Sequence, residues 1–278
     1  MKLIPEEKLR EICSEIEGLY GLYVSLPDEG EVFRLNSDTV FNAASTIKIP
    51  IMALMLKDCE EGRLSLNKTE ALAEENRVIG SGILKVMSHG VALSLYDYAV
   101  LMLVISDNSA TNHIIDAVGV DRFNAFCKEM GWNDTHLAGK LFCPKPILPD
   151  GKEDWNRTSA RDLGKMMELL LKEEMVSPEA SRMMKQIMAA QQAGKFDKSL
   201  PVKKHLDPSL PLPPVPEGFV QVINKGGTLK DKVLHDAAIL LLPNGRRAVI
   251  TLMTATKNNE KTMEIFKRAS KALYDHLI

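Results

Sequence analysis

The spacing of hydrophobic and polar residues divides the chain into strand-like ends and a helical middle. Near the start, "GLYGLYVSLP" and "GEVFRLN" meet at "PDEG" and predict a β-hairpin over residues 18–36. Near the end, "FVQVINKGG" predicts one strand, and "HDAAILLLPNGRRAVITLMT" predicts two more joined at "PNG". From Thr46 to about Met188 apolar residues recur mostly at helical spacing, and residues 261–278 predict a final helix.

This order of elements predicts an α+β fold in which both ends of the chain contribute to one antiparallel sheet. Residues 1–44 and 216–278 are expected to form the α/β part, with terminal helices packed against the sheet. Residues 45–215 are expected to form an inserted helical subdomain. The proline-rich segment "SLPVKKHLDPSLPLPPVPEG" excludes regular helix and central strand. A functional site is expected in the crevice between the two parts.

Composition narrows the classes of function. The net charge of -2 and the absence of a basic cluster predict no nucleic-acid or anionic-membrane partner. No apolar run approaches the roughly 20 residues of a membrane span. The start, "MKLIPEEKLREI", has the pattern of a helix rather than of a signal peptide, which predicts a cytoplasmic protein; the alternative is an exported protein whose leader has been removed. The pattern leaves the oligomeric state open.

Cysteine spacing gives no sign of a metal site. Cys13, Cys59, Cys127 and Cys143 form no CxxC pair and have no histidine at metal-ligand spacing. Small buried thiols are expected at Cys13, Cys59 and Cys127, which lie in helical patterns, and we expect neither a metal nor an organic cofactor.

One serine and one lysine stand three residues apart in "NAASTIKIPIMALML". Ser45 lies where a helix should begin, and Lys48 lies one turn later, ahead of an apolar run that should draw it into the core. A buried lysine has a lowered pKa and can accept a proton from a serine. The alternative is a helix-capping serine followed by a lysine whose amine reaches solvent. A second pair, Ser65 and Lys68, has no apolar helix behind it and is expected on the surface.

Polar residues also interrupt an apolar run at "ISDNSAT". Ser106, Asp107 and Asn108 follow "YAVLMLV" directly. Either Ser106 or Asp107 caps the next helix, or a second hydroxyl and an amide are directed into a cleft.

A third polar group ends a predicted strand at "INKGGT". Lys225 is followed by Gly226, Gly227 and Thr228. Two glycines at this point allow a ligand to approach the backbone closely, whereas the alternative is an ordinary turn.

The three groups, in this order, resemble the active-site set of serine β-lactamases and penicillin-binding proteins: SxxK, SDN and, with KGG in its place, K-T-G. "GSGIL", "NRTSARDLGKMM" and "HDAAILLLPNGRRAVITLMT" are similar to stretches of class A β-lactamases. The resemblance implies a β-lactamase/transpeptidase-like fold with an omega-like loop in the helical part. It also implies a small-molecule acyl or β-lactam substrate and a serine hydrolase that opens β-lactam rings through an acyl-enzyme.

The resemblance assigns each residue a role. Ser45 is the nucleophile, Lys48 its proton acceptor, and Ser106 the group that carries a proton to the leaving nitrogen. Asn108 binds the amide of the substrate, and Lys225 binds its carboxylate.

Neighbouring groups complete the expected site. Gly227 and Thr228 are expected to contact the substrate. The N–H of Ser45 and an N–H of the strand after Lys225, at Lys230 or a neighbour, are expected to stabilise the oxyanion.

Two departures from the family pattern are relevant to catalysis. Gly226 stands where the family has a hydroxyl that binds the carboxylate, and Thr228 supplies a hydroxyl only from another place in the strand. The glutamate of E-x-x-L-N, which activates the deacylating water in class A enzymes, has no counterpart in "LAGKLFCPKPILPDGKEDWN"; the acidic candidates are Asp150, Glu153 and Asp154.

Three functions therefore remain open. The first is a class A-like β-lactamase. The second is an esterase, amidase or peptidase of the same fold with slow or no β-lactam turnover. The third is a β-lactam-binding module that stays acylated.

Overall fold

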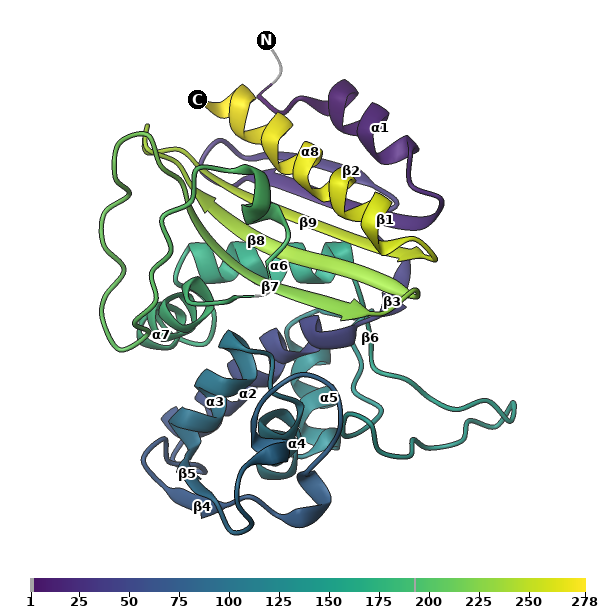
Figure 1. The fold of residues 1–278 in the computed structure, drawn as a ribbon, viewed down its shortest axis with the longest axis vertical. Coiled ribbons are helices and arrows are strands. Elements are labelled where there is room, and N and C mark those ends of the chain that lie inside the picture. The colour runs from purple at the N-terminus through teal and green to yellow at the C-terminus, as the bar shows by residue number, and fades with distance from the viewer. Residues whose placement is uncertain (1–2, 193) are drawn as a thin grey trace.

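The computed structural model of the chain describes residues 3–192 and 194–278. Five antiparallel strands form the main sheet in the order β2-β1-β9-β8-β7 (Figure 1). The first and last strands of the chain are neighbours in it, with Gly18 opposite Thr256. The strands are β1 (Gly18–Leu26), β2 (Glu31–Leu35), β7 (Gln221–Leu229), β8 (Val233–Leu241) and β9 (Arg247–Thr256).

Two terminal helices cover one face of this sheet. Helices α1 (Glu6–Ser14) and α8 (Asn259–Leu277) lie side by side there (Figure 1). Their apolar faces share a core with the strands, in which Leu9, Phe266 and Leu252 are completely buried. Burial of these side chains is the main force that fixes the terminal helices on the sheet.

Helix α6 (Ala160–Leu171) crosses the opposite face. It packs on the sheet through Leu163 and Met167, which join a second core that includes Met253. Gly164 makes this contact close, because a Cβ atom there would lie 2.2 Å from the ring of Tyr23. The sheet is therefore covered on both faces.

The remaining helices surround α2 (Lys48–Glu60) below the sheet (Figure 1). Every residue of α2 from Lys48 to Leu56 is buried, as expected for a helix that is apolar on all sides. Pro50 is tolerated because it lies in the first turn, where the backbone N–H has no partner within the helix. The other helices are α3 (Leu95–Val104), α4 (Asn108–Val118), α5 (Val120–Glu129) and α7 (Pro178–Ala189).

Short elements connect these parts. Strand β3 (Val40–Asn42) pairs with β6 (Arg157–Ser159), and β4 (Thr69–Ala71) pairs with β5 (Ala92–Ser94). The four 3₁₀ helices are η1 (Ala44–Ile47), η2 (Glu74–Asn76), η3 (Leu84–Val86) and η4 (Phe196–Ser199).

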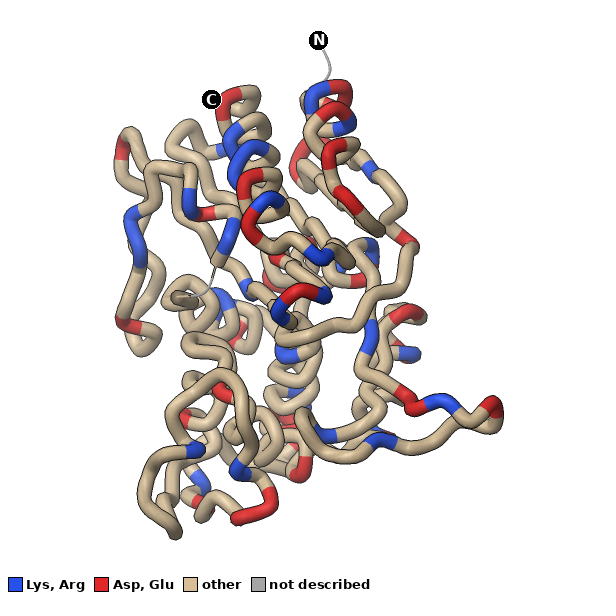
Figure 2. Tube along the Cα trace, turned by 45° about the vertical axis from the view of Figure 1, so that its right-hand side comes forward, with Lys and Arg blue, Asp and Glu red and all other residues tan. Residues whose placement is uncertain are grey.

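The predicted class, α+β with an antiparallel sheet and terminal helices, is confirmed. The division into residues 1–44 with 216–278 and residues 45–215 stays a prediction; within the second range, α6 packs on the sheet. Basic and acidic residues are interspersed over the molecule (Figure 2). No helix in the described ranges has the length and apolar character needed to cross a membrane.

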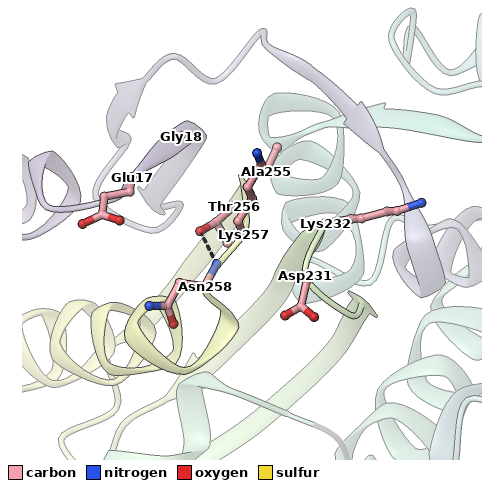
Figure 3. A pocket seen from close by; sticks show the side chains of 8 residues that line it. All are labelled: Glu17, Gly18, Asp231, Lys232, Ala255, Thr256, Lys257 and Asn258. Carbon is pink, nitrogen blue, oxygen red and sulfur yellow. Dashed lines mark hydrogen bonds between the residues drawn. The ribbon is translucent and has the colours of Figure 1, made fainter.

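A hollow of about 560 Å³ lies where β1 and β8 begin and β9 ends (Figure 3). Glu17 and Lys232 extend in opposite directions there. A hydrogen bond of 3.1 Å joins the Asn258 N–H to Thr256 Oγ1, and it belongs to the start of α8. The charged side chains of Glu17 and Lys232 therefore do not converge on a common point in the hollow.

Candidate active site

Ser45 lies in a tight turn directly before α2. It belongs to η1, whereas α2 begins at Lys48 and has no side-chain cap. The interpretation of Ser45 as a capping residue of α2 is therefore wrong. The turn is fixed by the preceding residues: Ala44 has a left-handed backbone with φ of 45°, and its N–H donates to Asn42 Oδ1 over 2.9 Å.

Lys48 is completely buried, and its amine faces the residues of the SDN motif. The Nζ atom lies 2.7 Å from the backbone oxygen of Ser106, 3.0 Å from Ser106 Oγ and 2.9 Å from Asn108 Oδ1. Burial lowers the pKa of Lys48 well below its ordinary value, the charge of Lys225 lowers it further, and Asp107 opposes the shift. The amine does not reach solvent, so the surface interpretation of Lys48 is wrong.

The SDN motif serves two purposes at once. Asp107 is the N-cap of α4, because its side chain accepts a hydrogen bond of 2.9 Å from the Ala110 N–H. Ser106 has a left-handed backbone with φ of 60° and directs its hydroxyl to the lysines. The side-chain amide of Asn108 donates to the backbone oxygen of Ile79 over 3.1 Å.

Lys225 reaches Ser106 from the sheet. Its Nζ atom donates to Ser106 Oγ over 3.0 Å and to the backbone oxygen of Gly226 over 2.9 Å. Burial lowers its pKa to about 7; the charge of Lys195 acts in the same direction, and Asp236 opposes it. Lys225 therefore titrates close to neutral pH.

Gly227 and Thr228, the two residues after Gly226, make different contributions to the site. A Cβ atom at Gly227 would lie 3.1 Å from the Ser45 nitrogen, so glycine lets β7 run directly against the nucleophile turn. Side chains alternate along a strand, so Thr228 shares a face with Gly226 and not with Lys225. The Thr228 hydroxyl thus lies about 7 Å further along β7 than the family's hydroxyl would.

A cleft of about 520 Å³ opens over Ser45. Its walls are residues 42, 44 and 45, residues 80–81, Asn108 at the start of α4, residues 141–143, 145 and 153–156, and residues 228–230. This volume suits a small organic ligand.

Asp154 lines the cleft, but its carboxylate is already engaged. One oxygen lies 2.8 Å from His136 Nε2, and the other accepts from Arg157 over 2.7 Å. Burial raises the pKa of this carboxyl, but the hydrogen bonds from His136, the Trp155 N–H and Arg157 outweigh burial and hold the pKa below its ordinary value. An ion-paired carboxylate of this kind is a weak proton acceptor.

The other two acidic candidates differ from Asp154. Glu153 is exposed and lines the cleft, and one of its oxygens lies 3.3 Å from the Lys145 N–H. Asp150 is exposed, forms an ion pair of 3.0 Å with Lys152 and is not part of the cleft wall. The structure therefore brings Glu153 and Asp154, but not Asp150, to the cleft of Ser45.

Sequence reasoning missed the residues that hold the 141–156 segment. Asn112 fixes its start, because its Nδ2 donates to the backbone oxygen of Leu141 over 3.0 Å and its Oδ1 accepts from the Leu141 N–H over 2.7 Å. Asn156 fixes its end by accepting the N–H groups of Ala138 and Gly139. The available signal was Asn112, a buried amide one helical turn after Asn108.

Comparisons with known proteins agree with this geometry. A model of the β-lactamase enzyme family matches residues 4–277. β-Lactamase PSE-4 of Pseudomonas aeruginosa is 28% identical over 133 residues, which are 48% of this chain and 46% of PSE-4. The chain thus spans about half the length of the curated relatives it matches.

Solved structures resemble the chain over nearly its whole length. A β-lactamase from Sphaerobacter thermophilus DSM 20745 is 27% identical with a TM-score of 0.81, covering 96% of this chain and 94% of that one. PBP-A is also 27% identical, with a TM-score of 0.80 over 97% of this chain and 94% of its own. The family model extends from before the first helix to the end of the last one, so the chain belongs to the β-lactamase enzyme family.

Proposed function

We propose that the protein is a serine hydrolase that opens β-lactam rings through an acyl-enzyme at Ser45. The observation that supports this most directly is the buried amine of Lys48, held between Ser106 and Asn108 beside the cleft of Ser45. Burial, with the charge of Lys225, lowers the pKa of Lys48 well below the ordinary value, and this favours the neutral amine that can act as a base.

The contacts of Lys48 fit a neutral amine, which has two hydrogens and one lone pair. The backbone oxygen of Ser106 and Asn108 Oδ1 only accept, so they take the two hydrogens. A third neighbour, Ser106 Oγ, lies 3.0 Å from the amine and also accepts from Lys225. Ser106 thus connects the base to the second lysine.

In the proposed acylation, Lys48 takes the proton of Ser45 as the Oγ atom bonds to the lactam carbonyl carbon. The C–N bond then breaks, Ser106 gives its proton to the leaving nitrogen, and Lys48 restores the proton of Ser106. The Ser45 N–H and an N–H from residues 228–230 stabilise the oxyanion. Asn108 binds the substrate amide, and Lys225, when protonated, attracts the carboxylate.

Deacylation is proposed to be slow. Of the two carboxylates that line the cleft, Asp154 is ion-paired with Arg157, which leaves Glu153 as the candidate base. The loss of a well-placed general base typically slows a step by about 10²–10⁴-fold. The acyl-enzyme should therefore accumulate. A PBP-A variant that is 26% identical to this chain was solved as an acyl-enzyme complex with penicillin G, which supports a long-lived adduct here.

Rapid mixing with penicillin G followed by intact-protein mass spectrometry tests this function. We expect a burst of product stoichiometric with enzyme, an adduct on Ser45, and slow turnover. Fast turnover without an adduct would contradict slow deacylation. An adduct that never decays would instead identify a binding module.

An esterase, amidase or peptidase of the same fold is the second candidate. Gly226 favours it, because the hydroxyl expected to bind a β-lactam carboxylate is missing at this position. Cleavage of simple esters by a protein that no penicillin labels would identify this function.

A further inference from the structure

We infer that residues 210–216, in the insert between η4 and β7, form a polyproline II ligand for a partner protein whose binding groove is lined by aromatic rings. The insert runs along the left side of the molecule in Figure 1. The inference concerns an interaction surface and is independent of the reaction proposed at Ser45. It gives a role to the proline-rich segment, which no step of that reaction uses.

The sequence of this segment restricts its backbone at nearly every position. Each residue of "LPLPPVP", residues 210–216, is a proline or directly precedes one. Proline fixes its own φ at about −65°, and the residue before a proline is restricted to extended or polyproline II conformations. Within the described part of the chain, these seven residues belong to neither helix nor strand. The sequence therefore favours polyproline II, a helix without internal hydrogen bonds.

Turns hold the segment at both ends. The Leu210 N–H donates to the backbone oxygen of Asp207 over 3.2 Å, which closes the turn before the prolines. The Phe219 N–H donates to the backbone oxygen of Pro216 over 3.1 Å, which closes the turn after them. The segment is thus presented in an extended form, so this chain loses little conformational entropy when a partner binds.

Burial along the segment follows the period of a polyproline II helix, which has three residues per turn. Leu212 and Val215, three positions apart, are partly buried, and Leu212 packs against the core that contains the apolar residues of α2. Pro211 and Pro214 lie on a second edge, and both are exposed. The third edge begins with Leu210, which is 53% exposed. One edge therefore anchors the segment, and the other two face outward.

Two outward edges suit an aromatic-lined groove. Such grooves bind P-x-x-P segments by packing aromatic rings against the prolines of a preformed helix. Pro211 and Pro214 form one P-x-x-P pair. Pro213 and Pro216 form a second pair, but Pro216 is partly buried where the turn begins. The contact surface is thus Pro211 and Pro214, together with the exposed side chains of Leu210 and Pro213.

The charges at the ends of the segment narrow the class of groove. Between residues 207 and 218 the ionisable side chains are Asp207 and Glu217, and both are exposed. Ser209 donates to the Asp207 carboxylate through Oγ, over 2.6 Å, and through its N–H, over 3.0 Å, and these bonds lower the pKa of Asp207. Two acidic side chains thus flank the prolines, and the partner groove is expected to carry basic residues at its ends.

Isothermal titration of the whole protein with purified SH3 domains tests the inference, because these domains bind P-x-x-P segments in an aromatic-lined groove. The panel contains domains with basic residues and domains with acidic residues beside the groove. We expect saturable binding to the basic domains, and binding at least tenfold weaker to the acidic ones. Equal binding to both kinds would overturn the charge complementarity. The absence of saturable binding across the panel would overturn the inference and leave the insert as a semi-rigid spacer.

Substitutions in this chain locate the contact. The double variant Pro211→Ala and Pro214→Ala should bind the basic domains at least tenfold more weakly, because it removes both rings of the exposed P-x-x-P pair. Leu206→Ala is the matched control, since Leu206 is 69% exposed in the same insert but lies before the prolines. All three side chains are exposed, so both variants should keep the circular dichroism spectrum of wild type. Equal binding by the two variants would overturn the inference.

A synthetic peptide of residues 207–218 should compete for the same domains. Because two turns hold the segment in the folded protein, we expect the whole protein to bind more tightly than the peptide. Binding of the peptide but not of the protein would show that the packing of Leu212 and Val215 hides the ligand, and would overturn the inference. None of these measurements involves Ser45, so failure of this inference and failure of the proposed function are distinguishable.

Discussion

Lys48 and Lys225 approach one oxygen atom from two elements of the fold, each with Nζ 3.0 Å from Ser106 Oγ. Both lysines are completely buried. Two full positive charges at this spacing repel each other, and the charge of Lys225 contributes to the lowered pKa of Lys48. The arrangement favours the neutral form of Lys48, while Lys225 retains its proton up to about pH 7.

The titration of Lys225 predicts that stability rises with pH just above neutrality. The folded protein loses this proton near pH 7, whereas an unfolded lysine keeps its proton up to a pKa of about 10.4. Between these values the unfolded state binds more protons, so the free energy of unfolding increases, by up to about 1.4 kcal/mol per pH unit.

Urea unfolding of wild type and Lys225→Met at several pH values checks this. The slope of the free energy of unfolding against pH should be steeper in wild type between about pH 7 and 8.5. Above this range Cys13 and Cys127, whose pKa values are raised by burial, act in the opposite direction in both proteins. Parallel slopes in the two proteins would show that Lys225 does not titrate as proposed.

The two SxxK pairs of the chain provide a matched experiment on the nucleophile. Ser45→Ala should abolish the penicillin adduct in intact-protein mass spectrometry, with an unchanged circular dichroism spectrum. Ser65→Ala should leave the adduct unchanged, because Ser65 is exposed and Lys68 forms a surface ion pair of 2.6 Å with Glu70. Loss of the adduct in Ser65→Ala would show that Ser65, and not Ser45, is the nucleophile.

Glu153 is the residue whose removal should prolong the acyl-enzyme. Glu153→Gln keeps the shape of the side chain but removes the proton acceptor, and the lifetime of the adduct should increase by less than the roughly 10²-fold expected for a well-placed base. Asp150→Asn is the control, because Asp150 lies outside the cleft wall. Equal adduct lifetimes in wild type and Glu153→Gln would leave Lys48 as the base for both steps.

Asn112 and Asn124 form the same kind of clamp on two different segments. Asn124 holds Leu137 through two hydrogen bonds of 2.9 Å, as Asn112 holds Leu141 at the cleft. Alanine at either position should lower the free energy of unfolding by about 1–3 kcal/mol, because backbone groups lose their partners. Only Asn112→Ala should also slow acylation by benzylpenicillin, since Leu141 lines the cleft of Ser45 and Leu137 does not. Equal acylation rates in the two variants would show that the hydrogen bonds of Asn112 to Leu141 do not affect acylation.

Much of the fold and of the central site could be predicted because their signals are local. The apolar residues after Lys48 predicted its burial, and the strand patterns at both ends predicted the sheet. The two interpretations of the SDN motif proved compatible, since Asp107 caps the helix while Ser106 faces the lysines.

The features of the site that the sequence did not predict depend on contacts between distant residues. The engagement of Asp154 requires His136, which has no motif of its own and is brought close by the β-bridge to Arg157. The left-handed backbone of Phe142 could not be predicted, because no glycine or asparagine marks it. The 3₁₀ turn at Ser45 likewise depends on Asn42 and on contact with Gly227.

The pairing of β1 with β9 determines when this protein can work during its own synthesis. Strands β1 and β2 are translated well before β9 and α8. Until then the early hairpin has no neighbour for its second edge, and Lys225 has no sheet to hold it beside Ser106. A nascent chain therefore carries Ser45 before the sheet that positions Lys225 is complete, and its unpaired apolar strand edge is prone to aggregation. Penicillin labelling of stalled nascent chains should appear only once the last strand has emerged.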